Sequence, residues 1–107
     1  VSERQKNTML GADGKHITFE KAHEIATDAL LGLARDPELV GRFLAVSGIG
    51  PESIRLAAEE PGFLAGVLEF YMADETLLLT FCENSGLRPT MIAAARFALA
   101  GDPADYA

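Results

Sequence analysis

Residues 36–51, with the sequence DPELVGRFLAVSGIGP, carry the signals for one complete short helix and the start of another. Asp36 is a preferred helix N-cap, and Pro37 has the φ angle that a first helical turn needs. Gly48 readily adopts the left-handed conformation that ends a helix. Pro51 can then occupy the first turn of the next helix. The stretch therefore predicts two helices joined by a tight turn.

Residues 74–89, with the sequence DETLLLTFCENSGLRP, repeat this pattern 38 positions later. When residues 22–58 are laid over residues 60–96, nine positions are identical, whereas chance in so Ala- and Leu-rich a chain gives about three or four. A unit of about 35 residues buries too little surface to be stable alone. We therefore predict an internal duplication, with two three-helix halves packed together. The identical pairs are helix caps, initiating prolines and apolar positions: Leu30/Leu68, Asp36/Asp74, Leu39/Leu77, Phe43/Phe81, Ser47/Ser85, Gly48/Gly86, Pro51/Pro89, Ile54/Ile92 and Ala57/Ala95.

Similar end signals occur outside these two stretches. Thr18 can cap a first helix, in which apolar residues from Ala22 to Leu33 recur at helical spacing. Pro61 can begin a fourth helix, and the last apolar segment ends at Gly101. No segment alternates apolar and polar residues as a strand does. The prediction is an all-α domain, a compact bundle of about six short helices over residues 17–101, with a flexible leader at 1–16 and a tail at 102–107.

The composition disfavours several classes of partner. The 107 residues carry a formal net charge of −7, and an acidic surface repels the phosphates of nucleic acids and of anionic lipids. No apolar run is long enough to span a bilayer, and the polar start of the chain does not resemble a secretion signal. Cys82 is the single cysteine, so no intrachain disulfide can form, which suits a reducing compartment. We expect a cytoplasmic protein without a membrane partner.

The two repeated stretches resemble the DNA-binding helix-turn-helix pattern, in which a glycine turn is followed by apolar residues at fixed spacing. The chemistry fits poorly, because a recognition helix needs Arg, Lys, Asn or Gln to contact bases and phosphates. Residues 51–60 offer only Arg55 against three glutamates, and residues 89–100 are mostly apolar. A degenerate helix-turn-helix regulator is therefore an alternative, which a shared arginine face at Arg55, Arg88 and Arg96 would favour.

The chain lacks the patterns of known catalytic and metal sites. The pair Glu20-x-x-His23 occurs once, whereas a helical di-iron site needs it twice, together with two further carboxylates. We expect Cys82 to be a small buried apolar residue, since no Lys or His lies near it in sequence. Neither a Gly-x-Ser-x-Gly motif nor a phosphate-binding glycine loop is present. The sequence predicts no enzyme and assigns no catalytic, cofactor-binding or metal-binding residue.

Two helices of the second half are apolar on more than one side. Phe97 points away from the main apolar face of its helix, and Leu79 lies opposite that of the preceding helix. Either these helices are central and buried on several sides, or they form a surface for self-association or a protein partner. We take Leu79 and Phe97, with Arg88 and Arg96, as the candidate interaction surface. A small apolar ligand between the halves is a further alternative, because an apolar cleft leaves little trace in a sequence.

Residues 36–44 and 48–55, followed by residues 63–70 and 74–79, resemble motifs of a family of short alphaproteobacterial proteins of unknown function. The resemblance covers roughly residues 19–98. It implies a helical fold and a bacterial cytoplasmic setting, and it transfers no activity and no site residue. Together with the composition, it leads us to expect a non-catalytic helical interaction or accessory module.

Overall fold

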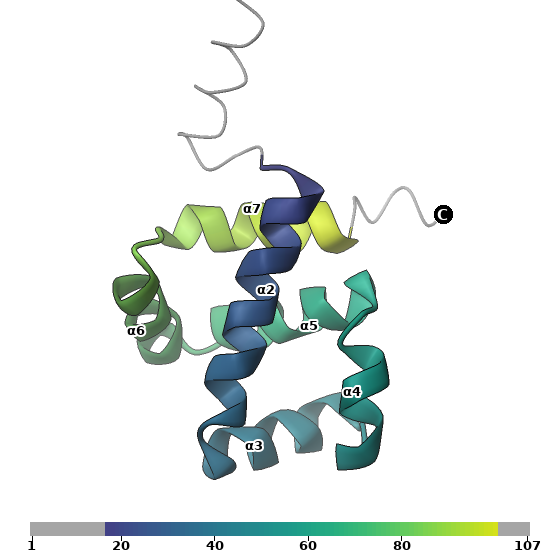
Figure 1. The fold of residues 1–107 in the computed structure, drawn as a ribbon. Coiled ribbons are helices and arrows are strands. Elements are labelled where there is room, and N and C mark those ends of the chain that lie inside the picture. Colours follow the sequence, from purple (N-terminus) through teal and green to yellow (C-terminus); the bar gives the residue numbers. More distant parts are fainter. Residues whose placement is uncertain (1–16, 101–107) are drawn as a thin grey trace, which may run out of the picture.

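The computed structural model describes residues 17–100, and every regular element in that range is a helix (Figure 1). The prediction of an all-α domain of six helices is therefore confirmed for these residues. The predicted leader, residues 1–16, and tail, residues 102–107, lie outside the described part of the chain. The elements are α2 (Phe19–Ala34), α3 (Pro37–Ser47), the 3₁₀ helix η1 (Pro51–Ser53), α4 (Ile54–Ala57), α5 (Pro61–Met72), α6 (Glu75–Ser85) and α7 (Pro89–Ala100).

The predicted caps form at the predicted residues. The Asp36 carboxylate accepts two backbone N–H groups from the first turn of α3, at 3.0 and 3.4 Å. Asp74 accepts one from the first turn of α6, at 3.1 Å. Gly48 and Gly86 end α3 and α6 with φ angles of 75° and 70°, a left-handed conformation that glycine adopts without steric cost. These local signals therefore determine where both helices begin and end.

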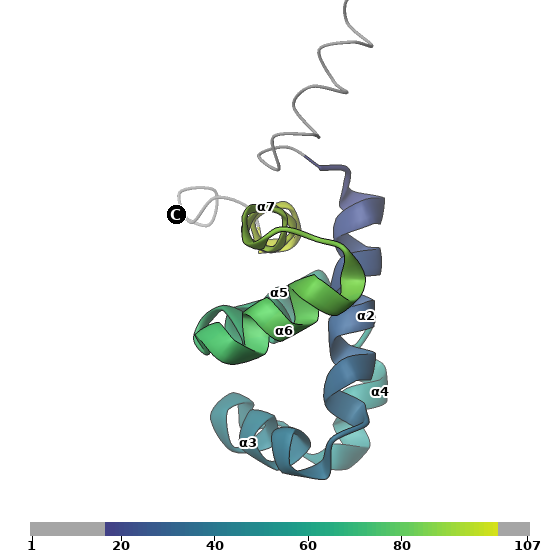
Figure 2. The ribbon, with the colours of Figure 1, turned by 90° about the vertical axis from the view of Figure 1, so that its left-hand side faces the viewer.

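Helix α2 runs past the other long helices. In both ribbon views α7, α5 and α3 lie one below another, and α2 crosses all three (Figures 1 and 2). The core lies where α2, α5 and α7 meet. Three alanines of α2 keep this contact close, and larger side chains from α5 and α7 fill the remaining space. The buried residues of these helices are Ala22, Ile25, Ala26, Ala29, Leu33, Leu64, Ala65, Val67, Leu68, Tyr71, Ile92, Ala94, Ala95 and Leu99.

One buried hydrogen bond joins α5 to α2. The Tyr71 hydroxyl donates to the Ala29 carbonyl oxygen at 2.7 Å. Gly32, one turn along α2, leaves room for this hydroxyl, because a Cβ atom at that position would lie 3.0 Å from it. Burial raises the pKa of Tyr71 to about 12, since the phenolate is poorly solvated there.

The segment from α3 to α4, residues 37–58, packs less tightly than its apolar sequence suggests, and we call it the α3–α4 arm. Phe43 is the one buried residue of α3, and α4 has none. The third helix, predicted to begin at Pro51, starts as a 3₁₀ turn and is only four residues long in its α part. Two apolar side chains of the arm are largely exposed, Val46 at 75% and Leu56 at 79%. Because these helices bury so few of their residues, several apolar side chains of the arm stay at the surface.

The helix boundaries of the two halves agree. A shift of 38 residues carries α3 onto α6 and carries the end of α2, Ala34, onto the end of α5, Met72. The third helices differ, because α7 packs extensively on α5 and α2 whereas α4 buries nothing. The internal duplication therefore stays a prediction, supported by the boundaries and not by equivalent packing.

Candidate functional site

The apolar residues chosen from the sequence lie on two helices that diverge. Leu79 in α6 is 48% exposed and Phe97 in α7 is 52% exposed. Helix α7 leaves the α6–α7 turn and runs across α2, away from α6 (Figure 1). Phe97 lies eight residues beyond the start of α7, which corresponds to about 12 Å along a helix. Both side chains are accessible, and their role as contact residues stays a prediction.

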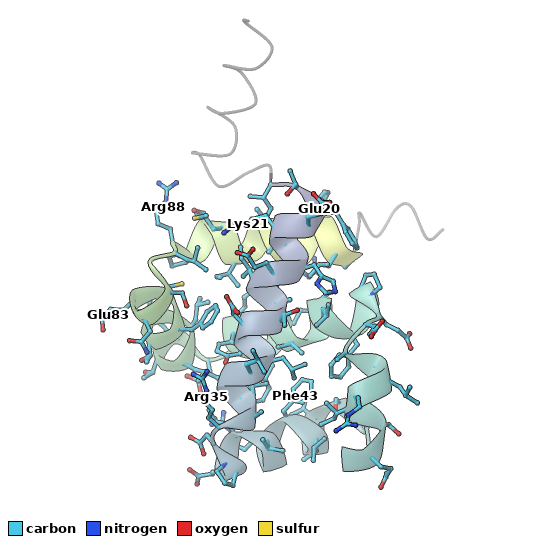
Figure 3. The ribbon with its side chains drawn as sticks, viewed as in Figure 1. Glu20, Lys21, Arg35, Phe43, Glu83 and Arg88 are labelled. Atoms are coloured by element: carbon cyan, nitrogen blue, oxygen red, sulfur yellow. The ribbon has the colours of Figure 1, made fainter. Side chains whose placement is uncertain are left out.

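The three arginines that a helix-turn-helix regulator would need lie on separate elements. Arg55 belongs to α4, and Arg88 lies at the turn before α7 (Figure 3). Arg96 in α7 forms an ion pair with Glu69 of α5, with its Nε atom 2.9 Å from the carboxylate. Helix α7 also buries one side against α2 and α5, although a recognition helix needs its reading face exposed. The geometry therefore does not provide a shared arginine face.

A groove lies between α3 and α5, at the place between the halves where an apolar cleft was one alternative, but none of its lining residues was predicted as a site. It has a volume of about 830 Å³ and reaches the start of α6. We call it the α3–α5 groove. Pockets of about 300–1,000 Å³ are typical of ligand sites, and this one is open along its length. Its lining residues are Arg42, Phe43, Val46, Ser47, Ile49, Gly62, Phe63, Gly66, Glu69, Phe70, Ala73, Asp74 and Glu75.

Three aromatic rings form the inner wall of the α3–α5 groove. Phe43 occupies the space between α3 and α5 (Figure 3) and meets two rings of α5 edge-on. Its centroid lies 5.6 Å from Phe63 and 5.4 Å from Phe70, at interplanar angles of 80° and 83°. Such edge-to-face pairs add about 0.5–1.5 kcal/mol beyond the burial of their area. These contacts hold the α3–α4 arm against α5 and leave the groove apolar.

Charged residues border the end of the groove where α5 meets α6. Arg42 forms an ion pair with Asp74 at 3.2 Å, and its guanidinium lies 5.5 Å from the Phe70 ring centroid. The pKa of Asp74 is lowered, first by the backbone N–H of Leu77 and then by Arg42. Among the described residues, no hydrogen bond or ion pair involves the side chain of Glu75, which begins α6. The rim is therefore acidic, with one carboxylate available.

Two glycines of α5 line the groove although the fold does not require them. A Cβ atom added to Gly62 or Gly66 would have no neighbour within 4 Å. Glycine within a helix costs about 0.5–1 kcal/mol relative to alanine, and neither residue has a positive φ angle. Gly66, in the interior of α5, is therefore a destabilising residue beside an open apolar surface, whereas Gly62 lies in the first turn. The absence of both side chains allows close approach of another backbone.

A smaller groove lies on the other side of α3. Its volume is about 480 Å³ and its lining comes from α2, α3 and α4. Phe43 lines both grooves and separates them. The second groove lacks acidic residues and helical glycines in its lining, so the features that mark the first groove are missing from it.

The described residues show few groups with catalytic potential. Cys82 is buried, as predicted, and burial raises the pKa of its thiol. The Nδ1 atom of His23 lies 3.5 Å from the Thr27 hydroxyl. Within residues 17–100, no group of three His, Cys, Asp or Glu side chains comes together in a way that could hold a metal. In the same residues, no helix combines the length and apolar character that crossing a bilayer requires.

The groove could not be identified from periodicity, because its residues come from two helices that are distant in sequence. One signal was available. Gly62 and Gly66 are one helical turn apart in a segment otherwise rich in apolar residues, and such spacing indicates a helix surface suited to close packing. The exposure of Val46 gave no sequence signal, since its spacing in α3 resembles that of a core residue.

Comparison with known proteins identifies a family and nothing more specific. Searches against curated proteins and against solved structures gave no match. The family model described as "Protein of unknown function (DUF3572)" matches residues 19–102. That range begins with α2 and includes every described helix through α7. The chain belongs to the DUF3572 family of proteins of unknown function.

Proposed function

We propose that this protein is a non-catalytic interaction module that receives a helix of a partner protein in the α3–α5 groove. The observation that carries the proposal is the pair of glycines, Gly62 and Gly66, on an open apolar wall. The groove runs between helices of 11 and 12 residues, about 17–18 Å long. Docking of an amphipathic helix in such a groove is a recurring mode of recognition.

The residues around the groove are occupied in structural roles, which favours binding over catalysis. Arg42 and Asp74 form an ion pair, and Glu69 forms another with Arg96. Enzymes instead place nucleophiles and proton-transferring groups, often with shifted pKa values, in a shared cleft. The thiol of Cys82 is buried away from this groove.

The charge distribution favours a protein partner over a nucleic acid. The groove lining contains three acidic residues and one arginine, and the remaining arginines discussed above lie on separate elements. Nucleic-acid binding draws most of its affinity from clustered cations. The bacterial and cytoplasmic setting, and an alphaproteobacterial distribution of the family, are further parts of this proposal.

Capture of partners from a lysate of the native cell tests the proposal with three forms of the protein. Gly66→Leu places a large side chain in the groove, and its Cβ atom meets no neighbour in the chain. Gly41→Leu is the matched control, because Gly41 is also helical and open but lines neither groove. We expect the wild type and Gly41→Leu to retain a protein after nuclease treatment, and Gly66→Leu to lose it.

Three other results would redirect the proposal. Retention of the same protein by Gly66→Leu would exclude the groove as its binding site. In that case Leu79→Asp and Phe97→Asp, in the same assay, test the surface predicted from the sequence. Retention of nucleic acid that disappears on nuclease treatment would favour the helix-turn-helix regulator. A groove that binds only small apolar compounds would favour the ligand-binding alternative.

A further inference from the structure

We infer that the helix received by the α3–α5 groove is amphipathic and cationic, with small residues facing Gly62 and Gly66 and a Lys or Arg near Glu75. This inference rests on the proposed function and adds the chemistry of the occupant. Three features of the groove support it: the balance of charge at its rim, the uneven distribution of that charge, and the shape of its floor.

The charge balance at the rim favours a positive occupant. Arg42 is the single base among the lining residues, against Glu69, Asp74 and Glu75, and Glu69 is paired with Arg96 of α7. Arg42 is already paired with Asp74 and lies over the Phe70 ring, so it does not offset Glu75. Glu75 is therefore the lining carboxylate that no base of the described residues pairs with. Apolar walls strengthen the attraction of a nearby cation, because they lower the local dielectric constant. A second copy of this chain, with a net charge of −7, would instead be repelled.

The charge is confined to one end of the groove. Glu69, Asp74 and Glu75 follow one another around the corner from α5 to α6. At the start of α5, Gly62 and Phe63 line the groove beside apolar residues of the arm. An occupant that matches this surface has its cation at one end and apolar residues along the rest of its length. The groove therefore also prefers one orientation of the helix.

The floor of the groove allows a docked helix to approach α5 closely. Because Gly62 and Gly66 have no Cβ atom and no neighbour above them, a second helix can approach α5 closely at that point. The distance between two packed helix axes depends on the side chains at their contact, so the closest approach is reached when the occupant also has small residues such as Gly, Ala or Ser there. The lengths of α3 and α5 limit the docked part to about three helical turns.

Two fluorescent model peptides test this chemistry directly. Each has about 14 residues of alanine and leucine at helical spacing. One carries lysines in both end turns, so that either orientation brings a cation to Glu75, and its twin carries glutamates at the same places. Fluorescence anisotropy at low salt measures their binding to the whole protein. We expect the lysine peptide to bind at least tenfold more tightly than the glutamate peptide.

Three variants locate the interaction. Gly66→Leu should lose binding of the lysine peptide, and Gly41→Leu should bind it as the wild type does. Glu75→Gln should narrow the tenfold preference by removing the available carboxylate, and higher salt should do the same. Light scattering on the same samples reports any self-association.

The outcomes separate this inference from the proposed function. Two outcomes overturn the cationic occupant: groove-dependent binding without a preference for lysine, and no binding of the lysine peptide to the wild type. In either case the lysate capture decides whether the proposed function holds. A dimer that Gly66→Leu disrupts also overturns the cationic occupant, because the occupant is then a second copy. Lysine-peptide binding that Gly66→Leu does not change overturns it too and counts against the groove itself.

Discussion

Tyr71 is a single side chain that connects two core helices, α5 and α2. Its ring is buried in the core, and its hydroxyl reaches the Ala29 carbonyl beside Gly32. The Ala29 carbonyl also lies within a continuous helix, so it is not left without a donor when the hydroxyl is removed. Tyr71 therefore contributes to stability mainly through its hydrogen bond between α5 and α2, which requires the hydroxyl to stay protonated.

Replacement of Tyr71 by Phe should lower the free energy of unfolding at pH 7 by about 0.5–1.5 kcal/mol, the net value of one hydrogen bond. The difference in unfolding free energy between the two proteins should shrink at high pH. The pKa of Tyr71 is raised from 10.0 to about 12, so its stabilising contribution is fully present below pH 10 and is lost as the pH rises through 12. Urea titrations of both proteins from pH 7 to 11 measure this difference, and a constant difference would contradict it.

Substitution of Gly66 tests whether the glycine that lines the groove lowers the stability of the protein. We expect Gly66→Ala to raise the free energy of unfolding by about 0.5–1 kcal/mol, because alanine is the better helix former and the added Cβ meets nothing. Gly32→Ala is the comparison, since its Cβ would lie 3.0 Å from the hydrogen-bonded Tyr71 hydroxyl. Thermal unfolding should rank Gly66→Ala above the wild type and above Gly32→Ala; the reverse order would show that the fold needs Gly66.

The α3–α4 arm, like α6, has a single buried side chain. Phe43 provides its contact with Phe63 and Phe70, whereas α2, α5 and α7 each bury several residues. Regions with few buried apolar contacts open at a lower free energy than the rest of a domain. The arm, which forms one wall of the groove, is thus expected to open more readily than α2, α5 and α7.

Amide hydrogen exchange should reveal this difference. We expect amides of α3 and α4 to exchange faster than those in the middle of α2, α5 and α7, because they can open without global unfolding. Hydrogen exchange of the wild-type protein, followed by mass spectrometry, is sufficient to compare these rates. Binding of an occupant to the groove should slow exchange in α3. Equal protection of all helices would show that the arm unfolds only with the core.

The ends of the helices could be predicted from sequence because capping is local. Asp36, Gly48 and their counterparts Asp74 and Gly86 act on residues within a few positions of themselves. The packing of α3 could not be predicted, since its apolar spacing does not say how many neighbours it has. Val46 has the spacing of a core residue and is 75% exposed. The groove depends on this tertiary arrangement and was missed for the same reason.

Across the whole molecule, α2 contacts α7, α5 and α3, and it packs more extensively against α5 and α7 than against α3. Its upper part packs with α5 and α7 into the core, and its end leads into the more weakly attached α3 (Figures 1 and 2). The candidate residues Leu79 and Phe97 lie on the second half, and the groove lies between the halves. We therefore expect a partner to contact both halves of the chain at once.

Site-specific photo-crosslinking in the native cell is the most direct test of whether a partner helix occupies the groove. A crosslinking phenylalanine analogue replaces Val46, at the lip of the groove, or Leu56, which is equally exposed on the same arm and lines neither groove. The account predicts a discrete protein adduct from position 46, no such adduct from position 56, and its loss when Gly66→Leu is added. An adduct from position 56 alone, or one at position 46 that survives Gly66→Leu, would contradict it.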